Sequence, residues 1–210
     1  MSQNTIKIIA TILMVIDHIG FLVENPLMRI IGRLSFPLFA WVFAINWQRK
    51  KKDGGSANSM IVRLILFGSI AQIPSLILFS SLRLNILLSF GLTAITFQQM
   101  QMRKEKLLVM GIGITIAQIL NVDYGWFAII CPLLMMSPVS KKWWFVWILT
   151  NLLYTSLAQS LIQLAAIFAP LIIMYHNPAK DQKPSELEKR FFYYFYPLHL
   201  AALAALRGYI

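Results

Sequence analysis

The sequence predicts an all-α membrane protein, a polytopic bundle of about nine transmembrane helices that forms a single domain over residues 1–210. Two observations carry this prediction. The chain is 58% hydrophobic and only 13% charged, about half the charged share of a typical soluble domain, and its mean hydropathy is +0.67. Its apolar residues also come in long runs, as expected for helices that cross a hydrocarbon core about 30 Å thick.

Nine apolar segments follow one another along the chain. Several are short for a span, which is compatible with little tilt, a thinned bilayer or shielding inside the bundle. The single cysteine, Cys131, lies in one of these runs, and we interpret it as a buried core residue; it excludes an internal disulfide and a cysteine metal cluster. The predicted spans are residues 6–23, 30–47, 60–79, 84–99, 107–121, 124–138, 143–157, 160–175 and 191–207.

The positive charges predict the orientation of the bundle. The net charge is +11, and thirteen of the 19 basic residues lie in four loops: "QRKKKDGGSANS", "MRKEK", "SKKW" and "HNPAKDQKPSELEKR". With nine spans all four loops fall on one side, which the positive-inside rule makes the cytoplasm. The N-terminus is then inside and the C-terminus outside. No nucleic-acid-binding motif accompanies the charge, so we expect membrane lipids rather than nucleic acid as its partners.

The first segment contains "ILMVIDHIGF", which puts Asp17 and His18 inside the membrane. An acid at the centre of a membrane helix costs about 2.5–3.5 kcal/mol on insertion scales, so the pair indicates a function. Histidine is the commonest general base, because imidazole exchanges protons near neutral pH. The alternative for His18 is a hydrogen bond between helices.

Lys7 precedes His18 by eleven residues. Eleven steps of about 100° complete three turns, so both side chains lie on one face of a helix, about 16 Å apart. A cation at the inner surface below a base suits an anionic cofactor whose reactive end reaches into the membrane. The alternative for Lys7 is an interfacial anchor.

Further polar residues lie in or near the other segments. Arg29 and Arg33 stand four residues apart on one helix face, and either is a partner for Asp17; such an ion pair has the alternative role of only holding the bundle together. His199 is a second intramembrane histidine, for the same site or for packing. Gln72, Asn85 and Asp123 add polar atoms toward the outer half, and no zinc-ligand spacing or phosphate-binding glycine loop is present.

Several stretches between about residues 6 and 207 are similar to the motifs of a known protein family. In order and spacing the chain resembles the TraX family, which is named for the F-pilin acetylation protein of conjugative plasmids. The spacing of Lys7 and His18 also resembles the basic-x10-His signature of the acyltransferase-three family of membrane acyltransferases. The stretches are "IKIIATILMVIDHIGFL", "MRIIGRLSFPLFAWVFA", "VRLILFGSIAQIPSL", "LRLNILLSFGL", "VDYGWFAI" and "FYPLHLAALAAL".

This resemblance implies a multi-pass acetyltransferase of the bacterial inner membrane. It would transfer acetyl from acetyl-CoA to the N-terminal amine of a pilin-like protein, without a metal, with His18 as the general base. The resemblance implies a role for His18 and for Lys7, the basic position of the signature. The other candidates match positions of the family motifs, and the resemblance assigns them no firm role. We take His18, Asp17 and His199 as the catalytic candidates, Lys7, Arg29 and Arg33 as the cofactor-binding candidates, and Arg63, Asn85 and Asp123 as further site candidates.

Two other functions stay open. The first is a membrane O-acetyltransferase of a surface glycan or lipid. The second is a small transporter, or a scaffold of a secretion or conjugation assembly. Transporters tend to show inverted repeats with broken helices in matching halves, and this sequence shows no such symmetry.

Overall fold

The regular structure in the computed structural model is helical across the residues that it describes, which are 1–54, 56–182 and 185–208. Within these ranges the sole β-type pairing is an isolated parallel bridge between Leu84 and Val122. Lys183, one of the basic loop residues counted above, lies outside them. The elements are α1 (Gln3–Leu22), α2 (Pro26–Gly32), α3 (Ser35–Lys52), α4 (Asn58–Phe79), α5 (Ile86–Met102), α6 (Lys106–Ile119), α7 (Phe127–Met135), α8 (Lys141–Ala158), η1 (Leu161–Phe168), α9 (Ala169–Ile173), η2 (Pro178–Lys180) and α10 (Glu186–Arg207).

Each of the nine predicted segments falls on helix, so the all-α prediction is confirmed. Three stretches are long and apolar enough to cross a membrane by length and composition: Gln3–Leu22, Pro26–Lys52 and Asn58–Phe79. Some of the other helices are too short to cross the hydrocarbon core. α7 has nine residues and α6 has 14, which at about 1.5 Å per residue is less than the hydrocarbon thickness. The chain is therefore a helical membrane protein, and the count of nine spans stays a prediction.

The helices group into two compact units. The first consists of the described parts of residues 1–46 and 131–184, and the second of the described parts of residues 47–130 and 185–210. α3 and α7 each begin in one unit and end in the other. The prediction of one domain over the whole chain is not tested by this division.

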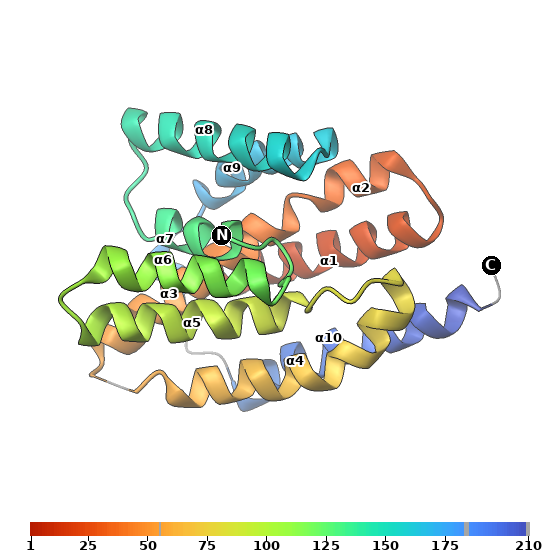
Figure 1. Ribbon diagram of the computed structural model, residues 1–210, viewed down its shortest axis with the longest axis horizontal. Helices are drawn as coiled ribbons and strands as arrows, with labels where there is room; N and C mark the ends of the chain where they lie inside the picture. Colours follow the sequence, from red (N-terminus) through yellow and green to blue (C-terminus); the bar gives the residue numbers. More distant parts are fainter. Residues whose placement is uncertain (55, 183–184, 209–210) are drawn as a thin grey trace. The chain divides into compact units, whose positions relative to one another are not determined.

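In the first unit α1 and α2 lie side by side, and α8 packs on η1 (Figure 1). Ser2 caps the start of α1, because its hydroxyl accepts a hydrogen bond from the backbone N–H of Thr5 and so satisfies one free donor of the first turn. Ser35, the first residue of α3, donates a 2.8 Å hydrogen bond to the carbonyl of Ala10. That buried bond ties α3 to the middle of α1.

In the second unit α4 packs on both α5 and α10, and α5 packs on α6 (Figure 1). Glycine allows the close approaches: a Cβ on Gly68 would lie 2.8 Å from the side chain of Leu88. Arg207 of α10 donates to the carbonyls of Ile77 and Leu78, the last turn of α4, at 2.8 and 2.6 Å. A cation there complements the negative end of the α4 dipole.

Candidate functional site

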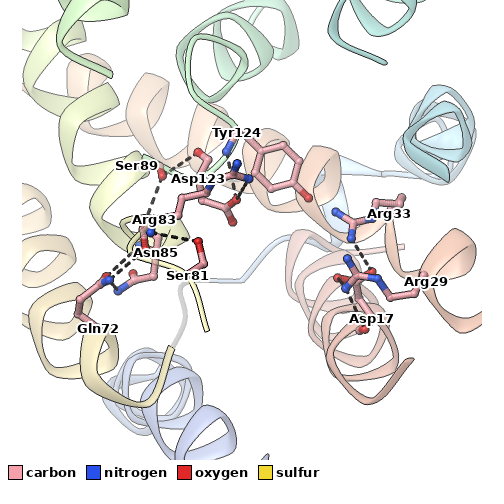
Figure 2. Close-up of polar contacts among 10 residues, drawn as sticks. All are labelled: Asp17, Arg29, Arg33, Gln72, Ser81, Arg83, Asn85, Ser89, Asp123 and Tyr124. Atoms are coloured by element: carbon pink, nitrogen blue, oxygen red, sulfur yellow. Dashed lines mark hydrogen bonds and ion pairs between the residues drawn. The ribbon is translucent and has the colours of Figure 1, made fainter. Parts of the chain in front are cut away.

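The first unit contains a compact group of charges, Asp17 with Arg29 and Arg33, which we call the α1–α2 cluster (Figure 2). Arg29 Nη1 lies 2.9 Å from Asp17 Oδ2 and 3.3 Å from the Asp17 carbonyl. Arg33 Nη2 lies 3.4 Å from Asp17 Oδ1, and the Arg29 guanidinium also stands 5.2 Å from the centre of the Phe21 ring. The side chains are 13–21% exposed, so the cluster is largely withdrawn from solvent.

The local sequence explains why α2 returns to Asp17. α1 ends at Leu22, and Glu24 takes a left-handed conformation with φ of 52°. Asn25 then caps α2 by accepting from the backbone N–H of Met28, and Pro26 occupies the first turn, where its missing N–H costs nothing. These signals end one helix and start the next within four residues.

Two glycines set the distance between the helices. A Cβ on Gly20 would lie 2.6 Å from Met28 Cβ, and one on Gly32 would lie 2.6 Å from Asp17 Cα. Both values are shorter than real Cβ contacts, so only glycine allows this approach. The expected pairing of Asp17 with an arginine is therefore confirmed, and it involves both arginines.

His18 and Lys7 lie on α1 with Asp17. α1 is continuous over Gln3–Leu22, so the eleven-residue spacing holds and both side chains stand on one face of one helix. Both are partly buried. The structure thus keeps a cation near the start of α1 and a histidine beside the α1–α2 cluster, while the chemical roles of these residues stay predictions.

The second unit holds a different polar group, built around Asn85 (Figure 2). Asn85 caps α5 by accepting from the Leu87 N–H at 3.1 Å, and its amide donates to the carbonyl of Gly68 at 2.7 Å and to Gln72 Oε1 at 2.8 Å. Asn85 is 3% exposed. Each polar atom of its side chain is used inside this unit, which favours a structural role over a catalytic one.

Asp123 belongs to the same neighbourhood. Its N–H donates to the Leu84 carbonyl at 2.7 Å, and its carbonyl accepts from the Ser89 hydroxyl at 2.9 Å. Its carboxylate lies 3.9 Å from Arg83 Nη1, with both side chains substantially exposed. An exposed pair at this distance contributes about 0–1 kcal/mol, so the backbone bonds rather than the charges hold this loop.

The remaining predicted residues, His199 and Arg63, also lie in the second unit. His199 Nδ1 stands 3.1 Å from the Phe195 carbonyl, and its ring stacks on that of Phe195 with centroids 5.2 Å apart. Arg63 is exposed, with its guanidinium 5.7 Å from the Tyr193 ring. His18 and His199 thus belong to different units.

The sequence analysis missed two polar groups of the first unit. One is centred on His176: its Nε2 lies 3.0 Å from Asp181 Oδ2, and Asp181 Oδ1 accepts from the Gln3 N–H at 2.7 Å. No spacing rule predicts such a loop contact. The other comprises Asn151 and Thr155 of α8, and their four-residue spacing inside an apolar segment was a usable signal.

No metal site emerges from the ranges that the structure covers. Among them there is no group of three or more His, Cys, Asp or Glu side chains placed to hold a metal ion. The polar groups found are an acid with two arginines, an amide network and a histidine–aspartate pair. Such groups can stabilise anions, order loops and exchange protons.

These features define a class: a helical membrane protein that keeps paired charges and a histidine within apolar helices. Residues 2–207 match the family described as TraX protein, and the chain belongs to that family. A curated relative, the uncharacterized protein RP591 of Rickettsia prowazekii (strain Madrid E), is 40% identical over 93 residues. The match covers 43% of this chain and 34% of that protein, so this chain spans about a third of its length. No solved structure matches the chain.

Proposed function

We propose that this protein is a multi-pass acetyltransferase of the bacterial inner membrane, which moves acetyl from acetyl-CoA to the N-terminal amine of a pilin-like protein. Membership of the TraX family supports the reaction class. The observation that carries the site is the α1–α2 cluster, an acid between two arginines beside His18 on an apolar helix. Ionisable side chains are rare within membrane helices, and those that occur there usually serve a function.

In this proposal His18 is the general base. The acceptor amine nitrogen attacks the thioester carbonyl carbon, the carbon–sulfur bond breaks, and His18 takes the proton that the amine loses. That proton then passes to the departing thiolate, so the products are an N-acetyl amide and the free thiol. Asp17 acts through Arg29 and Arg33, which it holds in place.

The net charge of the α1–α2 cluster and its distance from Lys7 suggest a different role for the arginines and for the lysine. One carboxylate and two guanidiniums leave a net charge of +1, which suits the negative charge that develops on the carbonyl oxygen. Lys7 lies ten residues before Asp17, about 15 Å along α1. We therefore assign the donor phosphates to Lys7 and the developing oxyanion to Arg29 and Arg33.

The test is acetyl transfer from radiolabelled acetyl-CoA into membranes that contain a pilin-like acceptor. His18→Ala should lower transfer by at least a hundredfold while membrane insertion is unchanged. Lys7→Ala should raise the KM for acetyl-CoA, and Lys104→Ala, which alters an exposed loop lysine, should not. Wild-type transfer by His18→Ala would refute the mechanism. Label on a glycan or lipid instead of the protein would replace the proposed acceptor with that of an O-acetyltransferase.

A further inference from the structure

α8 carries one buried stripe along its length. Its members are Trp143, Trp147, Asn151 and Thr155, spaced four residues apart and therefore on one face of the helix. The two tryptophan rings stack, with centroids 5.7 Å apart and an interplanar angle of 13°. The stripe is thus half aromatic and half polar, and none of its side chains ionises near neutral pH.

This stripe faces η1, and one contact fixes the register. α8 and η1 are joined by the short turn at Gln159 and Ser160 and pack together, so they run antiparallel. Trp147 Nε1 donates to the Ile167 carbonyl at 3.1 Å. Four α-helical residues rise about 6 Å, as do about three 3-10 residues. Counted from this contact, Asn151 lies at the level of Leu164, the residue that follows Gln163.

Three polar side chains of this hairpin are enclosed. Asn151 is 0% exposed, Gln163 3% and Thr155 5%. Asn151 Oδ1, Thr155 Oγ1 and Gln163 Nε2 are all inaccessible, and none has a hydrogen-bond partner among the described residues. Buried polar atoms are nearly always paired, so three such atoms on two packed elements mark a place where a polar ligand group can bind.

The donors and acceptors among these atoms limit the chemical class of the ligand. Gln163 Nε2 is a donor, Asn151 Oδ1 is an acceptor, and the Thr155 hydroxyl serves as either. The Asn151 amide nitrogen is already committed to the Trp147 carbonyl at 2.8 Å, which fixes which end of the side chain is open. A neutral group with both a carbonyl and an N–H fits this set, whereas a phosphate or an ammonium ion would find no opposite charge.

We infer that the α8–η1 hairpin binds an amide group, with Gln163 donating to the amide oxygen and Asn151 accepting from the amide N–H. The inference rests on the proposed function, which supplies two sources of amides: the pantetheine arm of acetyl-CoA and the backbone of the acceptor polypeptide. η1 also packs against α2, the helix that carries Arg29. A bound amide would therefore lie next to the element that holds the α1–α2 cluster.

The hairpin ends at an exposed turn next to the stripe. Thr155 is one turn from the exposed Gln159, so a polar side chain lies between the enclosed pair and the turn. η1 is a 3-10 helix of eight residues, about twice the usual length, and its hydrogen bonds are weaker than those of an α-helix. Opening this segment to admit an amide therefore breaks weaker hydrogen bonds than opening a regular helix would.

The test is equilibrium binding to the purified full chain, with two radiolabelled probes, pantetheine and glycylglycine amide. Gln163→Met and Thr155→Val remove the polar atoms at nearly constant volume. We expect each variant to weaken binding of one probe about five- to tenfold, the loss of one hydrogen bond, while its melting temperature stays equal or rises. Thr150→Val is the matched control, because Thr150 lies outside the stripe and bonds to Val146.

The results distinguish the two sources of the amide and test whether the hairpin binds an amide at all. Weaker binding of pantetheine alone assigns the site to the donor, and weaker binding of the dipeptide amide alone assigns it to the acceptor. Unchanged binding of both probes by the variants, or no binding by the wild type, overturns the inference. Because acetyl transfer is not the readout, amide binding without transferase activity would refute the proposed function alone.

Discussion

Gly32 lies directly against Asp17, and a single Cβ at position 32 would stand 2.6 Å from Asp17 Cα. This contact places α2 so that Arg29 within it and Arg33 directly after it both reach one carboxylate. A backbone approach of this kind cannot be relieved by rotating a side chain. The stability of the α1–α2 cluster therefore depends on a residue that has no side chain.

Replacing Gly32 with alanine should push α2 away from α1 and weaken both ion pairs. We expect a loss of about 1–3 kcal/mol in the free energy of unfolding, as for other overpacked positions. Gly111→Ala is the matched control, since a Cβ there meets nothing within 4 Å and alanine favours helix. Thermal melting of both variants in one detergent checks this, and equal melting temperatures would contradict it.

Asp17→Asn should be among the most damaging single changes in the first unit. It leaves two largely buried guanidiniums side by side without their carboxylate, which costs about 3 kcal/mol or more. Adding Arg33→Gln to Asp17→Asn should recover part of that loss, because one of the two like charges is then gone. Asp53→Asn, in an exposed turn, serves as the control. A double variant less stable than Asp17→Asn would argue against charge repulsion as the cause.

Asn85→Ala should destabilise the second unit more than Asn25→Ala destabilises the first. Both residues cap a helix, and a cap contributes about 1 kcal/mol. Asn85 additionally makes two buried bonds, to Gly68 and Gln72, each worth about 0.5–1.5 kcal/mol. Chemical denaturation of the two variants gives the comparison. If Asn85→Ala abolished acetyl transfer at unchanged stability, a catalytic role for Asn85 would replace the structural one.

Asp181→Ala should loosen the start of α1. The carboxylate accepts from the Gln3 N–H and pairs with His176, and a hydrogen bond to a charged group contributes about 1.5–3 kcal/mol. We expect faster amide hydrogen exchange in the first turn of α1. Lys180→Ala, next to it on the exposed side, should leave exchange unchanged. Equal exchange in both variants would show that the pair does not anchor the helix.

The orientation of the chain can be read from cysteine labelling in intact cells. Cys131→Ala removes the single cysteine, and new cysteines are then placed one at a time. With nine spans, cysteines at Leu82 and Gln159 should react with an impermeant maleimide, and those at Ser56 and Lys104 should react only after lysis. A reaction of Lys104→Cys in intact cells would refute the predicted topology.

Local pattern was enough to predict much of this protein. The long apolar runs predicted the helices, because a backbone in lipid must satisfy its own hydrogen bonds. The acid in the first run predicted a partner, because an unpaired charge there is too costly. The i, i+4 spacing of Arg29 and Arg33 predicted one shared face, which is how both come to meet Asp17. Each of these predictions depends on a few neighbouring residues only.

Other features depend on contacts between elements that are distant in the sequence. Asn85 was a further site candidate from its sequence position, and its bonds to Gly68 and Gln72 depend on how α4 packs on α5. Likewise, only the pairing of α8 with η1 brings Asn151 to the turn of η1 that holds Gln163. The sequence by itself determined the helices, their apolar character and the need to pair the buried charge. The tertiary structure decided which polar atoms meet, because helix packing depends on side-chain shape along whole interfaces, which no local spacing encodes.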